Sequence, residues 1–279
     1  PLLLVGLDHG IKAATAAGLS GIIVTGLIGG AMSGVLFSVI HALPAWIIVR
    51  QGLLKLPAAD GKTEEWYPVG SILCILSVFC TGLLTVAMFW SLGEDGGLHD
   101  IVQSYLGLVF AYMMPTMDEV VRGDLVQTIS PLFPGYMGTS WVVMAVVNAS
   151  IAAAILTRAK RFKRPKSKLA DLSLPDWMSW FLIAAAVMAL LGQGELEFFG
   201  RNLALILAVP FFFLGLGVVH ELARHVQFPG TLLAAFYFVM FLSGWIAMAV
   251  ILAGLLEQWV GLRRRFMNPG PDRNDEDDN

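Results

Sequence analysis

Residues 11–49 read IKAATAAGLSGIIVTGLIGGAMSGVLFSVIHALPAWIIV, and this stretch decides the fold class. Its 39 residues carry one charged side chain, so the whole stretch favours an apolar environment. As a single helix it would extend about 58 Å, far more than the roughly 30 Å hydrocarbon core of a bilayer. The stretch must therefore turn. The pair Gly29–Gly30 is the best hinge, and it predicts one span from Lys12 to Ile28 and another from Ala31 to Val49.

Similar apolar runs follow almost to the end of the chain. Hydrophobic residues make up 57% of the sequence and charged residues 14%, and the mean hydropathy is +0.72. A run of about 20 apolar residues crosses the hydrocarbon core as a helix, because a helix satisfies its own backbone hydrogen bonds. We therefore predict an all-α polytopic transmembrane bundle of about seven or eight spans. The further predicted spans are 69–92, 136–156, 177–191, 203–219 and 232–262.

Two parts of this pattern have alternative interpretations. Residues 101–116 and the amphipathic stretch 118–129 are predicted to form short helices on the outer face of the membrane, the alternative being that 101–116 spans it. The stretch 232–262 crosses once as a tilted helix, or twice as a hairpin broken near Ser243–Gly244. The hairpin returns Arg263–Arg265 to the cytoplasm and is favoured by the positive-inside rule.

The distribution of charge predicts the topology and the domains. Seven basic residues and no acidic one lie between Arg158 and Lys168. Short basic loops stay in the cytoplasm, so loop 157–175 and the C-terminus are predicted to be cytoplasmic. We assign residues 1–266 to a single transmembrane bundle and residues 267–279 to a disordered acidic tail. The expected partner is the lipid bilayer, and no nucleic-acid partner is expected.

The chain shows no hydrolytic, phosphate-binding or metal motif. Its five histidines are scattered without ligand spacing. Cys74 and Cys80 lie six residues apart in one apolar run, a spacing typical of neither a redox nor a metal site. We therefore expect no enzyme activity, no metal and no cofactor.

Polar groups in the spans are the first candidate ligand-binding residues. His41 stands in mid-span, where an ionisable group is costly and suggests a cavity or a relay. The alternative is a neutral imidazole hydrogen-bonded to a neighbouring helix, near the carbonyl that Pro44 frees. Asn148 is the polar point of its span, and it either contacts a ligand or forms an interhelical hydrogen bond.

Arg201 and Asn202 are the remaining candidates, at the outer end of the span 203–219. An arginine at this depth suits an anionic headgroup or substrate. The alternative is a local salt bridge, because Glu195 and Glu197 lie close in sequence. Near the other end of the chain, Glu257 is expected to pair with the arginines that follow it.

Small residues recur at a spacing of four along the first two spans. Such spacing creates a flat helix face that another helix approaches closely. We expect this face to pack within the bundle or to dock a separate membrane subunit. Its members are Ala13, Ala17, Gly21, Gly26, Gly30 and Gly34.

Several short motifs occur one after another along the whole chain. They are Trp66-Tyr67-Pro68-x-Gly70, Leu132-Phe-Pro-Gly135, Gly200-Arg-Asn-Leu-Ala-Leu-Ile-Leu-Ala-Val-Pro-Phe-Phe-Phe with Val219-His220, and Gly254-Leu-Leu-Glu-Gln-Trp259 with Arg263-Arg264-Arg265. In this order they resemble the YybS-like family, bacterial predicted membrane proteins of unknown function. That resemblance implies a location in a bacterial inner membrane. Members of that family tend to start with an additional apolar span, so we expect the N-terminus of this chain to be incomplete.

The YybS-like family is distantly similar to the S components, the substrate-capture subunits of energy-coupling-factor transporters. That resemblance implies a helical bundle with an outward-facing pocket and a partner subunit docked on an Ala-x-x-x-Ala pattern, which Ala13 and Ala17 match in this sequence. The larger number of spans, the acidic tail and the lack of a vitamin-pocket motif depart from it. We expect a small-molecule-binding or transport protein, and the alternative is a non-enzymatic membrane scaffold or assembly partner.

Overall fold

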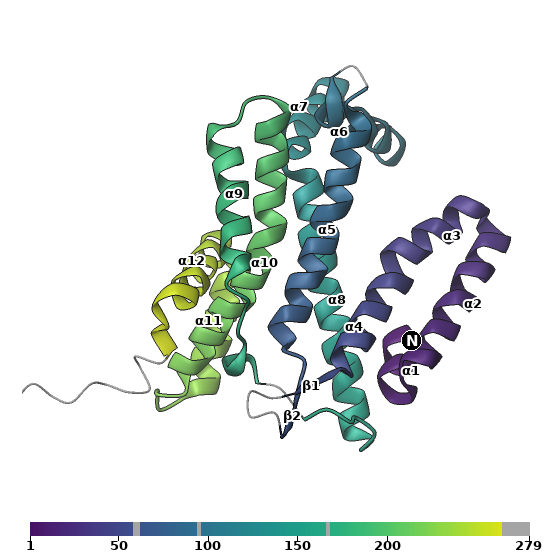
Figure 1. Cartoon of the computed structure of the whole chain (residues 1–279). Helices are drawn as coiled ribbons and strands as arrows, with labels where there is room; N and C mark the ends of the chain where they lie inside the picture. The colour runs from purple at the N-terminus through teal and green to yellow at the C-terminus, as the bar shows by residue number, and fades with distance from the viewer. Residues whose placement is uncertain (58–61, 94–95, 166–167, 264–279) are drawn as a thin grey trace, which may run out of the picture.

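The computed structural model describes residues 1–57, 62–93, 96–165 and 168–263, which are almost entirely helical, as predicted (Figure 1). The first part contains α1 (Leu2–His9), α2 (Ile11–Gly29), α3 (Ala31–Phe37), the π-helical turn η1 (Ser38–Ala42), α4 (Leu43–Gly52), the antiparallel strands β1 (Lys55–Pro57) and β2 (Glu64–Trp66), α5 (Val69–Ser91), α6 (Gly97–Met113) and α7 (Glu119–Ile129). The second part contains η2 (Ser130–Leu132), α8 (Phe133–Arg158), η3 (Leu169–Asp171), α9 (Trp177–Leu191), α10 (Glu195–Ala223), α11 (Pro229–Leu242) and α12 (Gly244–Val260). The predicted acidic tail lies outside the described residues.

The helices include enough long apolar segments for a multi-pass membrane protein. Among the described residues, five helical segments are long and apolar enough to cross a membrane, namely α2, Ala31–Gly52, α5, Glu119–Arg158 and α10. Helix α9 is apolar but shorter, and α11 with α12 forms a bent pair. This roughly fits the predicted seven or eight spans.

The first hairpin turns at the predicted glycine pair. Helix α2 ends at Gly29, and Gly30 has a φ of +83°, which L side chains rarely adopt. Helices α2 and α3 diverge from the other helices in Figure 1. The hairpin joins the bundle through α1 and α4, which pack against α8 and α5.

Helix α10 lies at the centre of the bundle. In its most apolar 18-residue window 56% of the residues are buried, against 11% in α2. Its adjacent residues Ile206 and Leu207 belong to two different hydrophobic clusters. One cluster packs α10 against α5 and α8, and the other packs it against α9 and the segment before α9. The core is therefore arranged in two layers with α10 between them.

Glycines set the close approach of α12 to α10. A Cβ atom on Gly215 would lie 1.9 Å from the carbonyl oxygen of Val250, and one on Gly254 would lie 1.9 Å from that of Phe211. Neither contact tolerates a side chain, because the obstacle is backbone. The two helices therefore touch at a distance that only glycine permits.

The segment 169–174, which we call the strap, crosses the end of the bundle that carries loop 157–175. We call this end the loop side. Gly217 faces the carbonyl oxygen of Leu169, and Gly70 faces that of Ser173, at 2.7 and 1.9 Å from an added Cβ atom. The strap is thus seated on α10 and α5 by two backbone contacts.

The last apolar stretch breaks where the sequence predicts it. Helix α11 ends at Leu242, α12 begins at Gly244, and the two axes are bent by 118°. Both outer ends of the pair lie beside Ala170 of the strap. The first turn of α11 lines a groove with Ala170, and Arg263, just after α12, donates a hydrogen bond to the Ala170 carbonyl. The pair is therefore a hairpin that returns to the loop side.

Helices α6 and α7 occupy the opposite end of the bundle, at the top of Figure 1. Asp118 caps α7, since its carboxylate accepts the Val120 N–H at 2.9 Å. The two predicted short helices therefore lie at the end remote from the basic loop, and their position on the outer face of the membrane stays a prediction. Glu94 and Asp95 of the connecting turn lie outside the described residues.

Candidate functional site

The first two predicted ligand-binding residues lie on exposed helix surfaces. His41 is exposed in η1, with its ring 5.5 Å from that of Phe37. The carbonyl freed by Pro44 is that of Ile40, and it accepts the indole N–H of Trp141 from α8 at 3.1 Å. This interhelical hydrogen bond is donated by Trp141 and not by His41, whose imidazole has no hydrogen-bond partner among the described residues. Asn148 is exposed and has no hydrogen-bond partner among the described residues.

Arg201 and Asn202 are neighbours in sequence with very different surroundings. The Arg201 guanidinium pairs with Glu197 one turn earlier, and 49% of its side chain remains exposed. This is the local salt bridge considered as the alternative to ligand binding. Asn202 is fully buried, so the two side chains do not share a pocket.

Asn202 joins α10 to the start of α8. Its amide oxygen accepts the Gly135 N–H at 2.7 Å, and its amide nitrogen donates to the carbonyls of Pro131 at 2.9 Å and Phe198 at 2.7 Å. The first turn of a helix has N–H groups without an intrahelical partner, and Pro134 supplies none. Asn202 thus caps α8 from another helix, a structural role that occupies the whole amide.

The small-residue face is used within the chain. An added Cβ atom on Gly21 would lie 2.5 Å from the Phe37 ring, and one on Gly34 would lie 3.3 Å from the Gly26 Cα. Gly30 is the hinge, while Ala13 and Ala17 are half-buried on α2. The packing interpretation therefore accounts for Gly21, Gly26 and Gly34.

The structure places a different polar cluster at the loop side, built around the predicted pair of Glu257 with an arginine. The Glu257 carboxylate accepts the Arg263 side-chain Nε–H and the Arg263 backbone N–H, each at 2.9 Å. Glu257 is 8% exposed and the Arg263 side chain 13%. A buried carboxylate of this kind is stable because a cation and two hydrogen bonds compensate its lost hydration.

The same arginine fixes the strap. Its two terminal nitrogens donate to the carbonyls of Ala170 and Leu172. Gln258 adds a hydrogen bond to the Leu174 carbonyl and another to the Asp176 carboxylate, both 3.1 Å long. The end of α12 is therefore bound to the strap through backbone groups.

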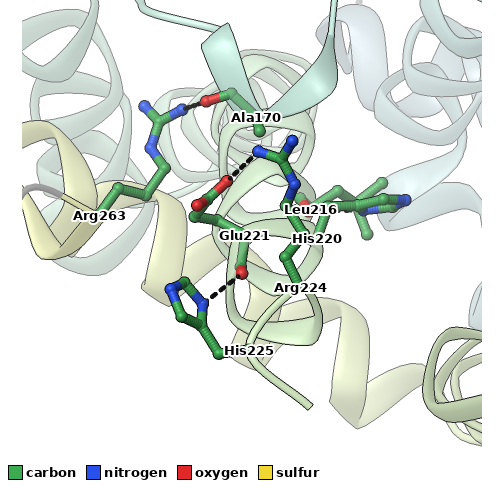
Figure 2. A network of polar contacts seen from close by, with 7 residues as sticks. All are labelled: Ala170, Leu216, His220, Glu221, Arg224, His225 and Arg263. Carbon is green, nitrogen blue, oxygen red and sulfur yellow. Dashed lines mark hydrogen bonds and ion pairs between the residues drawn. The ribbon is translucent and has the colours of Figure 1, made fainter. Parts of the chain in front are cut away.

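A second ion pair lies at the end of α10, near Arg263 (Figure 2). Arg224 donates to the Glu221 carboxylate at 3.0 Å, and His225 bonds the Glu221 carbonyl. Glu221 is 8% exposed, whereas 54% of the Arg224 side chain is exposed. Arg224 thus keeps guanidinium surface for a further acceptor.

These two ion pairs and the strap border a half-open cavity of about 350 Å³, which we call the polar cavity. Its lining is mostly polar and contains carboxylates, guanidinium groups, an amide and a hydroxyl. The lining residues are Ala170, Asp171, Ser173, Leu174, Leu214, Glu221, Arg224, Glu257, Gln258, Gly261 and Arg263. The cavity is at the lower end of the size range of small-molecule sites, about 300–1,000 Å³.

Metal binding has no support in the part of the chain that the structure describes. That part contains no group of three or more histidine, cysteine, aspartate or glutamate side chains able to hold a metal ion. Each carboxylate of the two ion pairs has an arginine partner within its own helix end.

The remainder of the basic loop is attached to the bundle. Arg161 pairs with Asp8 of α1, and the Arg164 guanidinium lies near the Trp66 ring. Burial lowers the pKa of Arg164 by desolvating its charged form, yet an arginine stays charged at neutral pH. The loop is therefore a positively charged surface held against α1 and β2.

Residues 1–257 match the family described as predicted membrane protein (DUF2232). The chain belongs to this family. It is accordingly a multi-pass membrane protein whose helices contact lipid. No curated protein and no solved structure matches the chain.

The motifs quoted from the sequence map onto these contacts. Gly70 lies under the strap, Gly135 is capped by Asn202, and Gly254 touches α10. Sequence reasoning missed Arg224 and the strap as parts of one site, because they meet only through tertiary contacts. The available signal was the spacing of Glu257 and Arg263, which did predict the ion pair.

Proposed function

We propose that this membrane protein binds a small polar molecule, as the resemblance to substrate-capture subunits implies, and that it does so in the loop-side cavity. The observation that carries the proposal is a polar cavity between two ion pairs whose carboxylates, Glu221 and Glu257, are buried in an otherwise apolar bundle. Ionisable groups close to the membrane interior are costly, and function is the usual reason for keeping them.

The lining indicates the chemistry of the ligand. Arg224 has free guanidinium surface for an anionic or carbonyl group, and Asp171 and Ser173 offer groups that accept hydrogen bonds. A molecule with both donors and acceptors, such as a small zwitterion, matches this mixture. An outward-facing pocket of the S-component type would lie at the opposite end, near Arg201.

Native mass spectrometry of the full-length protein, extracted gently from its own membrane, tests the proposal. We expect a co-purifying small molecule in the wild type, reduced at least tenfold in Arg224→Ala, since a hydrogen bond to a charged group contributes about 1.5–3 kcal/mol. Arg201→Ala is a matched control, because this arginine is equally exposed and also paired within α10. Loss of the molecule in Arg201→Ala, with retention in Arg224→Ala, would contradict the proposal and show that the binding site lies at the opposite end of the bundle.

A scaffold or assembly role is the second candidate. It is favoured by the first hairpin, where α2 is 11% buried and packs against α1, α3 and α4. In the same experiment, a stoichiometric protein partner without a small molecule would favour this role.

A further inference from the structure

A second hollow lies beside the polar cavity and has a different chemical character. It has a volume of about 230 Å³ and lies between the strap, the end of α10 and the first turns of α11. Ala170 and Arg224 line both hollows, so the two are adjacent. We call this second hollow the groove.

The groove combines an apolar wall with cationic groups. Leu169, Ala223 and Leu233 provide most of its surface, which is almost entirely apolar. Lys168 adds a positive charge, and Arg224 adds the guanidinium surface that its pairing with Glu221 leaves exposed. None of the described residues that line it is acidic. Lys168 is exposed and forms no ion pair with a described residue, so its charge is available to a ligand.

His220 adds a polar contact to the same wall. Its Nδ1 lies 2.9 Å from the Leu216 carbonyl, so this nitrogen carries the proton and donates. The ring packs against Tyr237 of α11, with centroids 6.0 Å apart. The second ring nitrogen has no hydrogen-bond partner among the described residues and is left for a ligand group.

The groove lies next to a helix surface that is exposed to the lipid. None of the residues of α11 is buried, and Leu232, next to the groove residue Leu233, is 43% exposed. The run of basic residues that ends at Lys168 belongs to loop 157–175 and lies, like the groove, on the loop side. Basic groups at this level of a membrane protein attract acidic lipid headgroups, each contributing about 1 kcal/mol.

We propose that the groove binds one anionic phospholipid. The phosphate group lies between Lys168 and Arg224, and an acyl chain follows Leu233 along α11 into the bilayer. The apolar wall selects a lipid over a free anion, because a free anion gains nothing from apolar surface. The groove shares Arg224 with the polar cavity, so the test variants are placed at Lys168 and Leu233, which do not line that cavity.

The test uses the delipidated full-length protein in detergent, with added phosphatidylglycerol or phosphatidylcholine, and measures the thermal unfolding midpoint. We expect phosphatidylglycerol to raise the midpoint more than phosphatidylcholine. Lys168→Ala should weaken the apparent affinity for phosphatidylglycerol about fivefold, as expected for one cation at a membrane surface. Leu233→Trp should abolish the preference by filling the groove.

Two control variants make the test specific. Lys163→Ala removes an exposed cation of the same loop, and Leu232→Trp adds the same bulk one residue away on α11; neither residue lines the groove. Both should respond as the wild type does. Equal stabilisation by the two lipids, an unchanged preference in Lys168→Ala, or a full shift with inorganic phosphate alone would each overturn the proposal.

Discussion

Asn202 connects two helices with a single amide group. Its three hydrogen bonds go to backbone atoms of Gly135, Pro131 and Phe198; those to Gly135 and Phe198 are buried, and that to Pro131 is partly buried. A backbone group that loses its partner in such a place keeps the full cost of desolvation. The stability of the α8–α10 contact therefore depends on this residue more than on its apolar neighbours.

We predict that Asn202→Leu lowers the free energy of unfolding by roughly 2–4 kcal/mol, because it leaves the buried Gly135 N–H and the partly buried Pro131 carbonyl without their partner. Asn148→Leu is the matched control. Asn148 is exposed on a spanning helix, so this change should alter stability by less than about 0.5 kcal/mol. Thermal unfolding of the purified variants in one detergent measures both. Equal losses would mean that Asn202 has no special role.

Sequence reasoning was able to predict ion pairs but not this cap. Glu257 and Arg263 lie six residues apart across a helix end, so local spacing predicts their contact, and the structure confirms it. Asn202 and Gly135 lie 67 residues apart, and the group that Asn202 binds is a backbone N–H, which no residue type marks. The prediction of Asn202 as a ligand residue arose from its polarity, which the structure uses for helix capping.

Helices in this protein meet through glycines whose roles the sequence cannot separate. Gly30 has a positive φ and turns the chain. Gly254 has an ordinary helical φ, and its missing side chain lets two helices pack closely. Both lie in apolar surroundings and look alike in a linear pattern. The breaks at Gly29–Gly30 and Ser243–Gly244 were predictable because a bilayer limits helix length, a constraint that applies to every span.

We predict that Gly254→Ala lowers the free energy of unfolding by at least 1–3 kcal/mol, roughly the cost of overpacking. The new methyl group meets the Phe211 carbonyl oxygen of α10, and backbone cannot move aside as a side chain can. Gly230→Ala provides the control, because a Cβ atom there has no neighbour within 4 Å.

That control should be neutral or slightly stabilising, since alanine is favoured over glycine in a helix by about 1 kcal/mol. The measurement is the thermal unfolding midpoint of each variant, compared with that of the wild type. If both variants behave alike, the contact of α10 with α12 does not depend on glycine.

The whole molecule has two chemically distinct ends. The loop side carries the basic loop, the strap and both ion pairs, and the other end carries α6 and α7. Both outer ends of the α11–α12 pair lie at the loop side, at Ala170. The arms have 14 and 17 residues, or about 21 and 26 Å, each shorter than the roughly 30 Å hydrocarbon core. The hairpin is therefore expected to enter the membrane from the loop side without crossing it.

Cysteine labelling with a membrane-impermeant maleimide in cells tests this topology, and we predict a different labelling pattern for each of three variants. Glu119→Cys, in α7, should be labelled in intact cells, and Lys163→Cys, in the basic loop, only after permeabilisation, because short basic loops remain cytoplasmic. Ser243→Cys, at the bend, should stay unlabelled in both conditions, since its position lies within the bilayer.

The unmodified chain serves as the background, because both natural cysteines are buried in α5. Labelling of Ser243→Cys in intact cells together with Glu119→Cys would show instead that α11 and α12 each cross the membrane. In that case the short arms would require a locally thinned bilayer, since a mismatched span is accommodated by thinning the membrane around it. The labelling pattern thus fixes the orientation of the bundle and shows which side of the membrane the polar cavity and the groove face.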